Sequence, residues 1–146
     1  MTTVSDIMTR GVRALAPTDS VRRAAQSMEE LNVGSVPVCN GKKLVGMVTD
    51  RDITLRCVAS GLDIEKTPLS DIMSKDVQWC FEDQPLSEVM AKMAESQIRR
   101  LPVVDREKHL VGIFSLGDLA TKTDNTKVAS VLQDISEPAT SAQTSS

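Results

Sequence analysis

An internal repeat is the feature that most constrains this sequence. The stretch LVGMVTDRDI at positions 44–53 recurs as LVGIFSLGDL at positions 110–119, with leucine, valine, glycine and one aspartate identical. SDIM at 5–8 recurs at 70–73, and VPV at 36–38 recurs as LPV at 101–103. The landmarks keep one order at a spacing of about 65 residues, which is longer than the common solenoid periods. The sequence therefore predicts two related units and not an array of short repeats.

Each copy contains the same order of predicted elements, which is strand, helix, strand, strand, helix. The first helix of each copy is amphipathic, since its apolar residues recur three and four apart. In the first copy the elements are expected at 11–17, 21–31, 35–39, 44–49 and 50–61. In the second copy they are expected at 76–83, 86–93, 100–105, 110–115 and 116–123. The sequence therefore predicts a mixed α/β fold built from two β-α-β-β-α repeats.

Composition excludes several classes of function. The net charge is −3 and no basic block is present, which argues against a nucleic-acid surface. The aromatic residues are Trp79, Phe81 and Phe114, too few to build a stacking platform for single strands. The first ten residues lack the apolar core of a signal peptide, and no apolar run approaches membrane-spanning length. We therefore expect a cytoplasmic protein that binds neither nucleic acid nor membrane.

Residues for catalysis or metal binding are scarce. Cys39, Cys57 and Cys80 form no CxxC pair and are expected to be buried as small apolar side chains. His109 is the single histidine, and no phosphate-binding glycine loop is present. We therefore expect a binding module that is not an enzyme and holds no metal.

A hydroxyl and a carboxylate recur at one place in each copy. Thr49 precedes Asp52 by three residues, and Ser115 precedes Asp118 by three, where a predicted strand ends and a helix begins. Residues three apart at a helix start lie on one face. A carboxylate can accept both hydroxyls of a ribose, and a hydroxyl beside a helix start suits a phosphate. The same spacing also suits a purely structural helix cap, so both interpretations stay open here.

The repeated motifs resemble the CBS domain, named for cystathionine β-synthase, a tandem pair of which is called a Bateman module. The resemblance rests on SDIM, NVGSVPV and LVGMVTDRDI, and on their partners SDIM, QIRRLPV and LVGIFSLGDL, and covers about residues 4–124. It implies two repeats packed around a pseudo-twofold axis with two clefts between them. We place repeat 1 at 1–65, repeat 2 at 66–124, a last helix at 125–136 and a disordered tail at 137–146.

In CBS proteins that bind adenosine compounds, the hydroxyl and the carboxylate of this motif bind the ligand. The resemblance therefore implies a regulatory module that senses AMP, ADP, ATP, S-adenosylmethionine or a cyclic dinucleotide, with no cofactor required. It places Met8, Thr9, Val12, Gly34, Ser35 and Ile113 around Asp118, and Met73, Ser74, Val77, Ile98, Arg99 and Met47 around Asp52. Arg99 and Arg100 are further candidates for phosphate contacts.

Three further expectations concern assembly and function. CBS pairs commonly form homodimers, and we expect one here because Ala24, Ala25, Met28, Val89, Met90 and Met93 offer more apolar surface than a small module covers. A downstream protein partner is expected but not identified. Gly34 and Ser35 are small, so we expect the Asp118 cleft to bind more tightly than the Asp52 cleft. The alternative function is a dimerisation or adaptor module with no small-molecule ligand.

Overall fold

The structure, a computed structural model, describes residues 2–122 of the 146-residue chain. The predicted helix at 125–136 and tail at 137–146 lie outside the described residues. The described chain forms two compact units. We call them the Asp118 unit (residues 2–12, 78–106 and 111–122) and the Asp52 unit (residues 13–77 and 107–110). Among residues 2–122, no helix combines the length and the apolar character that spanning a membrane would require.

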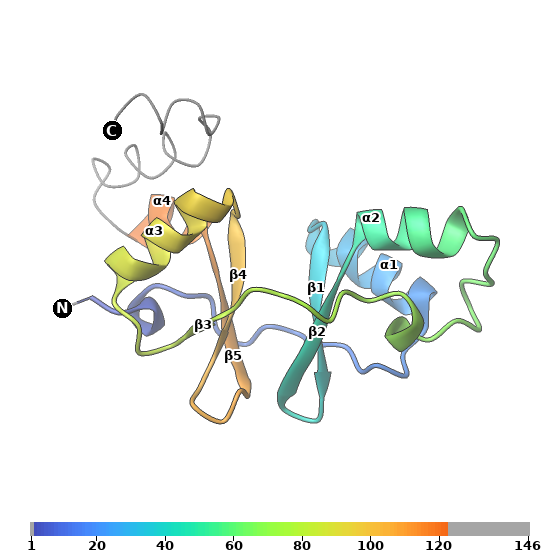
Figure 1. Cartoon of the computed structure of the whole chain (residues 1–146), viewed down its shortest axis with the longest axis horizontal. Helices are drawn as coiled ribbons and strands as arrows, with labels where there is room; N and C mark the ends of the chain where they lie inside the picture. The colour runs from blue at the N-terminus through green and yellow to red at the C-terminus, as the bar shows by residue number, and fades with distance from the viewer. Residues whose placement is uncertain (1, 123–146) are drawn as a thin grey trace. The chain divides into compact units, whose positions relative to one another are not determined.

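The Asp52 unit contains a two-stranded antiparallel sheet and two helical segments (Figure 1). α1 (Val21–Leu31) precedes β1 (Ser35–Asn40) and β2 (Lys43–Thr49), which pair with a bulge at Val38/Cys39. α2 (Asp50–Asp52) starts where β2 ends and continues directly as a π-helical segment, Ile53–Val58. A 3-10 turn at Leu69–Asp71 follows a long connection. This order confirms the predicted strand–strand–helix succession of the first copy.

Local sequence explains the limits of α1. The Ser20 side chain caps the helix by accepting a hydrogen bond from the Arg23 backbone N–H at 3.1 Å. The helix ends at Asn32, whose φ of 55° lies in the left-handed region, and the Val33 N–H donates back to the Met28 carbonyl at 3.0 Å. The buried face of α1 carries Val21, Ala24, Ser27 and Met28.

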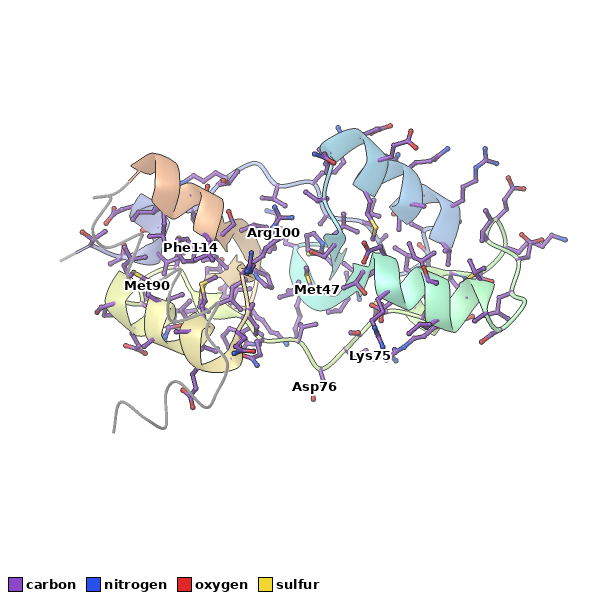
Figure 2. The ribbon with its side chains drawn as sticks, turned by 90° about the horizontal axis from the view of Figure 1, so that it is seen from above. Met47, Lys75, Asp76, Met90, Arg100 and Phe114 are labelled. Atoms are coloured by element: carbon purple, nitrogen blue, oxygen red, sulfur yellow. The ribbon has the colours of Figure 1, made fainter. Side chains whose placement is uncertain are left out.

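The Asp118 unit combines a three-stranded sheet with two helices (Figure 1). Its elements are a 3-10 turn at Val4–Asp6, β3 (Cys80–Phe81), α3 (Leu86–Ser96), β4 (Arg100–Val104), β5 (Leu110–Ser115) and α4 (Leu116–Lys122). The strand order is β3-β4-β5, with β3 parallel to β4. Phe114 on β5, labelled in Figure 2, is the largest fully buried side chain of the described residues. The mixed α/β class is therefore confirmed.

We call the two segments that carry the SDIM motif, residues 4–9 and 69–74, the SDIM turns. The first lies in the Asp118 unit with most of the second repeat, and the second lies in the Asp52 unit with most of the first repeat. The first turn joins the second repeat, since the Val4 N–H donates to the Gln84 carbonyl at 3.1 Å and the Leu86 N–H donates to the Thr2 carbonyl at 2.9 Å. Met8 is buried with Phe114 in one core cluster. The compact units therefore differ from the contiguous stretches 1–65 and 66–124. Those two stretches describe the repeat in the sequence only.

The strand predicted at 11–17 is wrong as a strand. In this stretch only Leu15 is buried, and it makes a single parallel bridge to Val38 on β1. Gly11 turns the chain with a φ of 70°, and Pro17 has no N–H to donate, so the ladder cannot extend in either direction. The corresponding strand of the second copy is reduced to Cys80–Phe81. The helix expected at 50–61 ends at Val58.

The apolar residues used to predict a dimer are mostly covered within their own units. Ala24, Met28, Val89 and Met93 are buried, Met90 is half-buried, and Ala25 alone among them is exposed. The premise of that argument is therefore wrong, because α1 and α3 bury these side chains against their own sheets. The large apolar side chains that remain exposed among the described residues are instead Leu31, Leu55, Val58, Leu62 and Ile64, all in the Asp52 unit.

Two serines, Ser27 within α1 and Ser20 at its N-cap, provide a matched test of this helix. Ser27 is fully buried, and its Oγ has no hydrogen-bond partner among the described residues. We predict that Ser27→Ala leaves the free energy of unfolding unchanged or raises it by up to about 1 kcal/mol, because an unpaired buried hydroxyl is removed. Ser20→Ala should lower it by about 1 kcal/mol, because the cap is lost. Urea denaturation measures both, and a larger loss for Ser27→Ala than for Ser20→Ala would contradict the assignment.

Candidate functional site

Two glycines allow the SDIM turns to lie against β2 and β5. The N–H groups and carbonyls of Met47 and Ser74 pair reciprocally at 2.9 and 2.8 Å, and those of Thr9 and Ile113 pair at 2.8 and 3.0 Å. A Cβ on Gly46 would lie 2.7 Å from the Ser74 carbonyl oxygen, and one on Gly112 would lie 2.7 Å from the Thr9 carbonyl oxygen. A strand residue with a side chain does not fit at either place. The glycine that precedes Met47 or Ile113 therefore sets the distance between turn and strand.

In the Asp52 unit this approach delivers a hydroxyl to a nearly buried carboxylate. Asp52 is 8% exposed. Its Oδ2 accepts a hydrogen bond from the Thr49 N–H at 3.0 Å, while the Asp52 N–H donates to Thr49 Oγ1 at 3.0 Å. Ser74 Oγ, from the SDIM turn, lies 3.4 Å from Oδ1 and 3.3 Å from Oδ2. Met47 and Met73, both buried, come from the strand and the turn that carry these groups.

The Asp118 unit repeats this arrangement. Asp118 is also 8% exposed. Its Oδ2 accepts hydrogen bonds from the Ser115 N–H at 3.0 Å and from Ser115 Oγ at 3.2 Å. Its Oδ1 accepts a short hydrogen bond of 2.6 Å from Thr9 Oγ1, more than one hundred positions away in the sequence. Two separate units therefore present the same cluster of one carboxylate and two hydroxyls.

Both interpretations of the hydroxyl–carboxylate spacing find support in this geometry. The reciprocal bonds between Thr49 and Asp52 are those of a helix capping box. A cap alone does not require the second hydroxyl, which Ser74 and Thr9 supply from the other sequence repeat. Nor does it require that the aspartate be buried, and Asp52 and Asp118 are each only 8% exposed. The structure therefore shows a cap with additional polar groups gathered around it.

The other predicted site residues divide between the two units. Met8, Thr9, Val12, Ile113, Ile98, Arg99 and Arg100 belong to the Asp118 unit, and Gly34, Ser35, Met47, Met73, Ser74 and Val77 belong to the Asp52 unit. The Gly34 carbonyl accepts the Asp50 N–H at 2.9 Å, and the Arg99 carbonyl accepts the Leu116 N–H at 3.1 Å. The predicted pairings of Gly34 and Ser35 with Asp118, and of Ile98 and Arg99 with Asp52, join residues of different units and stay predictions.

Sequence reasoning missed one charged neighbour of Asp52. Arg56 Nε lies 3.7 Å from Asp52 Oδ1, one helical turn further along the chain. The spacing of four residues between an acid and a base is the signal that could have found it. Arg51, beside Asp52, is exposed and lines an open depression of about 290 Å³ with Asp50, Thr54 and Leu55.

The cysteines carry no sign of reactivity. All three are buried and unpaired by disulfides. Burial raises the pKa of the Cys80 thiol to about 11, a shift that Lys92 partly offsets, and burial also raises the pKa of the Cys39 thiol. At neutral pH these two groups are protonated thiols, which are poor nucleophiles.

Comparison with known proteins agrees with this double arrangement. The sequence model of the CBS domain matches the chain twice, at residues 4–58 and 69–124. This chain belongs to the CBS-domain family. It is a tandem CBS pair, a regulatory type of module.

A curated relative and two solved structures illustrate the similarity. CBS domain-containing protein YhcV of Bacillus subtilis is 42% identical over 137 residues, which cover 93% of this chain and 96% of the relative. The CBS pair of protein MJ0100, solved with 5′-methylthioadenosine and S-adenosyl-L-methionine, is 30% identical with a TM-score of 0.69, over 83% of this chain and 94% of that one. CBSX2, solved in complex with AMP, is 28% identical with a TM-score of 0.71, over 83% of this chain and 95% of that one.

The role of the two strand glycines can be tested directly. We predict that Gly46→Ala and Gly112→Ala each lower the free energy of unfolding by about 1–3 kcal/mol, because the new Cβ meets a backbone carbonyl and the turn must shift. Gly117→Ala is the matched control, since its Cβ would meet nothing closer than Ser115 Oγ at 3.5 Å. That change should be neutral or slightly stabilising, because alanine favours the helix. Chemical denaturation of the three variants measures these changes in the free energy of unfolding. Equal changes for all three variants would contradict the proposed role of Gly46 and Gly112.

Proposed function

We propose that this CBS pair is a regulatory module that binds an adenosine-containing small molecule at Asp52 and at Asp118. The observation that carries the proposal is the nearly buried carboxylate with two hydroxyls, present once in each unit. The structures of similar CBS pairs with AMP, 5′-methylthioadenosine and S-adenosyl-L-methionine support it. The candidate ligands are AMP, ADP, ATP and S-adenosylmethionine, acting in the cytoplasm on an unidentified partner protein.

The proposed roles follow from the chemistry of each group. The carboxylates of Asp52 and Asp118 accept the two ribose hydroxyls, since a carboxylate has about four acceptor positions. Thr49 and Ser115 donate to a phosphate or to the equivalent polar tail of the ligand. Apolar side chains beside each carboxylate contact the flat base, and the candidates are Met8, Val12 and Ile113 in one unit and Met47, Met73 and Val77 in the other.

Arg99 and Arg100 are the proposed phosphate contacts of the pair. Arg99 is exposed and Arg100 is half-buried at the start of β4. The Arg99 carbonyl accepts a hydrogen bond from the N–H of Leu116, which lies in the first turn of α4 two residues before Asp118. Guanidinium groups bind phosphate oxygens in pairs, and such charge-assisted bonds are stronger than neutral ones.

The alternative function is a dimerisation or adaptor module without a small-molecule ligand. It is favoured by the capping box, because the reciprocal bonds of Thr49 and Asp52 already satisfy part of the carboxylate without a ligand. An adaptor would not bind nucleotides, whereas a sensor would bind them without converting them chemically. Screening a nucleotide panel by thermal shift separates the two, because a ligand at one hundred times its Kd stabilises by about 2.7 kcal/mol.

We predict that Asp52→Asn and Asp118→Asn each weaken AMP binding about tenfold or more, because each removes a charged hydrogen-bond acceptor. The amide keeps the side-chain shape and one oxygen that can still cap the helix. Asp83→Asn is the matched control, since that exposed carboxylate pairs with Arg106 and lies in neither cluster. Calorimetry measures each site, and the Asp118 change should remove the tighter event. AMP binding equal to wild type in both variants and in the double variant would show that the carboxylates are caps.

We predict a homodimer in solution. The exposed apolar side chains of the Asp52 unit, which include Leu55 at 49% and Val58 at 59% exposure, supply surface whose burial favours association. Light scattering coupled to size exclusion at tens of micromolar protein should give twice the chain mass of 15.8 kDa. A mass of one chain at that concentration would contradict the prediction.

A further inference from the structure

Arg56 occupies an unusual position beside the Asp52 carboxylate. Its Nε lies 3.7 Å from Asp52 Oδ1, and its Nη1 donates to the carbonyls of Ile72 at 3.3 Å and Met73 at 3.5 Å. Those two carbonyls belong to the SDIM turn that also supplies Ser74. The same turn therefore accepts hydrogen bonds from the Arg56 guanidinium and supplies the Ser74 hydroxyl, and both groups lie beside the Asp52 carboxylate.

The two oxygens of Asp52 are not equally engaged. Oδ2 accepts a well-formed hydrogen bond from the Thr49 N–H at 3.0 Å. Ser74 Oγ contacts both oxygens, at 3.3 Å from Oδ2 and 3.4 Å from Oδ1, and Arg56 Nε lies 3.7 Å from Oδ1. A ribose diol that hydrogen-bonds both oxygens of the carboxylate has to share Oδ1 with the Arg56 guanidinium. The Arg56 side chain is 55% exposed, so it can move into solvent when a ligand arrives.

We propose that Arg56 is a specificity-determining residue of the Asp52 site, where its guanidinium competes with a neutral ribose diol for the carboxylate. The inference rests on the proposed function, because it requires a ligand diol at Asp52. The two carbonyls of the SDIM turn pre-position the competitor, so it loses little side-chain entropy on contacting Asp52. The Asp52 site consequently binds an uncharged adenosine group more weakly than its hydrogen-bonding groups alone would allow.

The size of the effect follows from the exposure of the pair. The Arg56 side chain is 55% exposed and that of Asp52 is 11% exposed, so water and salt screen the pair from the side of the arginine and its contribution is small. Removing the competitor should therefore raise the affinity for a neutral diol by about two- to fivefold and not by orders of magnitude. Because the competition is electrostatic, higher salt should weaken it and raise adenosine affinity in the native protein.

The test uses adenosine, which carries the diol without a phosphate that Arg56 could attract. Calorimetry is done on the full chain in an Asp118→Asn background, so that binding at Asp52 is observed alone. Arg56→Gln should bind adenosine about two- to fivefold more tightly than the Asp118→Asn parent. Arg22→Gln is the matched control, because Arg22 is an exposed arginine of the same unit that pairs with Glu65 and should leave adenosine affinity unchanged.

The salt dependence of adenosine affinity is a second measurement. It would not change between the parent and Arg56→Gln if Arg56 had only a structural role. Raising sodium chloride from about 20 to 300 mM shortens the Debye length from about 20 to 6 Å and should tighten adenosine binding in the parent but not in Arg56→Gln. Equal or weaker binding by Arg56→Gln, with a parent that binds adenosine, overturns the competitor role and leaves the proposed function standing. Failure of the wild-type chain to bind either adenosine or AMP overturns the proposed function, and the competitor role with it.

Discussion

The paired backbone hydrogen bonds that join the SDIM turns to β2 and β5 are the contacts on which the rest of the structure depends. Thr9 and Ile113 exchange both of their hydrogen bonds, as do Ser74 and Met47. Each pair joins one sequence repeat to the other and fixes a hydroxyl beside an aspartate. The contact is possible only because Gly112 and Gly46 have no Cβ, since any side chain would meet the turn's carbonyl oxygen at 2.7 Å. A missing side chain thus determines where the polar cluster forms.

Burial makes that polar cluster costly unless its groups are paired. The carboxylate of an aspartate that is 8% exposed has lost much of its water, and the loss must be offset by hydrogen bonds or by charge. In the Asp118 unit the Ser115 N–H and two hydroxyls do this, including the 2.6 Å bond from Thr9. In the Asp52 unit the hydroxyl contact is longer and an arginine stands nearby. The two clusters share their residue types but differ in how the charge is balanced.

Much of the local structure was predictable because short-range physics decides it. The apolar face predicted α1 correctly, and β2 and β5 follow the apolar runs at 44–49 and 110–115. The strand at 11–17 was not predictable in the same way, because a strand exists only through its partner. In this stretch Gly11 turns the chain and Pro17 lacks an N–H, and one bridge forms, from Leu15 to Val38. The dimer argument failed for a related reason, since sequence shows that a helix face is apolar but not what covers it.

By itself, the sequence determined the repeat, the family and the residue types of each cluster. Thr49, Asp52, Ser115 and Asp118 were identifiable because a hydroxyl and an acid recur three residues apart at the same place in both copies. The resemblance also placed Ser74 near Asp52 and Thr9 near Asp118. Only the tertiary structure decided that these hydroxyls hydrogen-bond the carboxylates and that Arg56 lies beside Asp52. Sequence spacing reports neighbours along a helix or strand. Contacts between distant segments depend on which buried surfaces fit together, and that is settled only when the whole core packs.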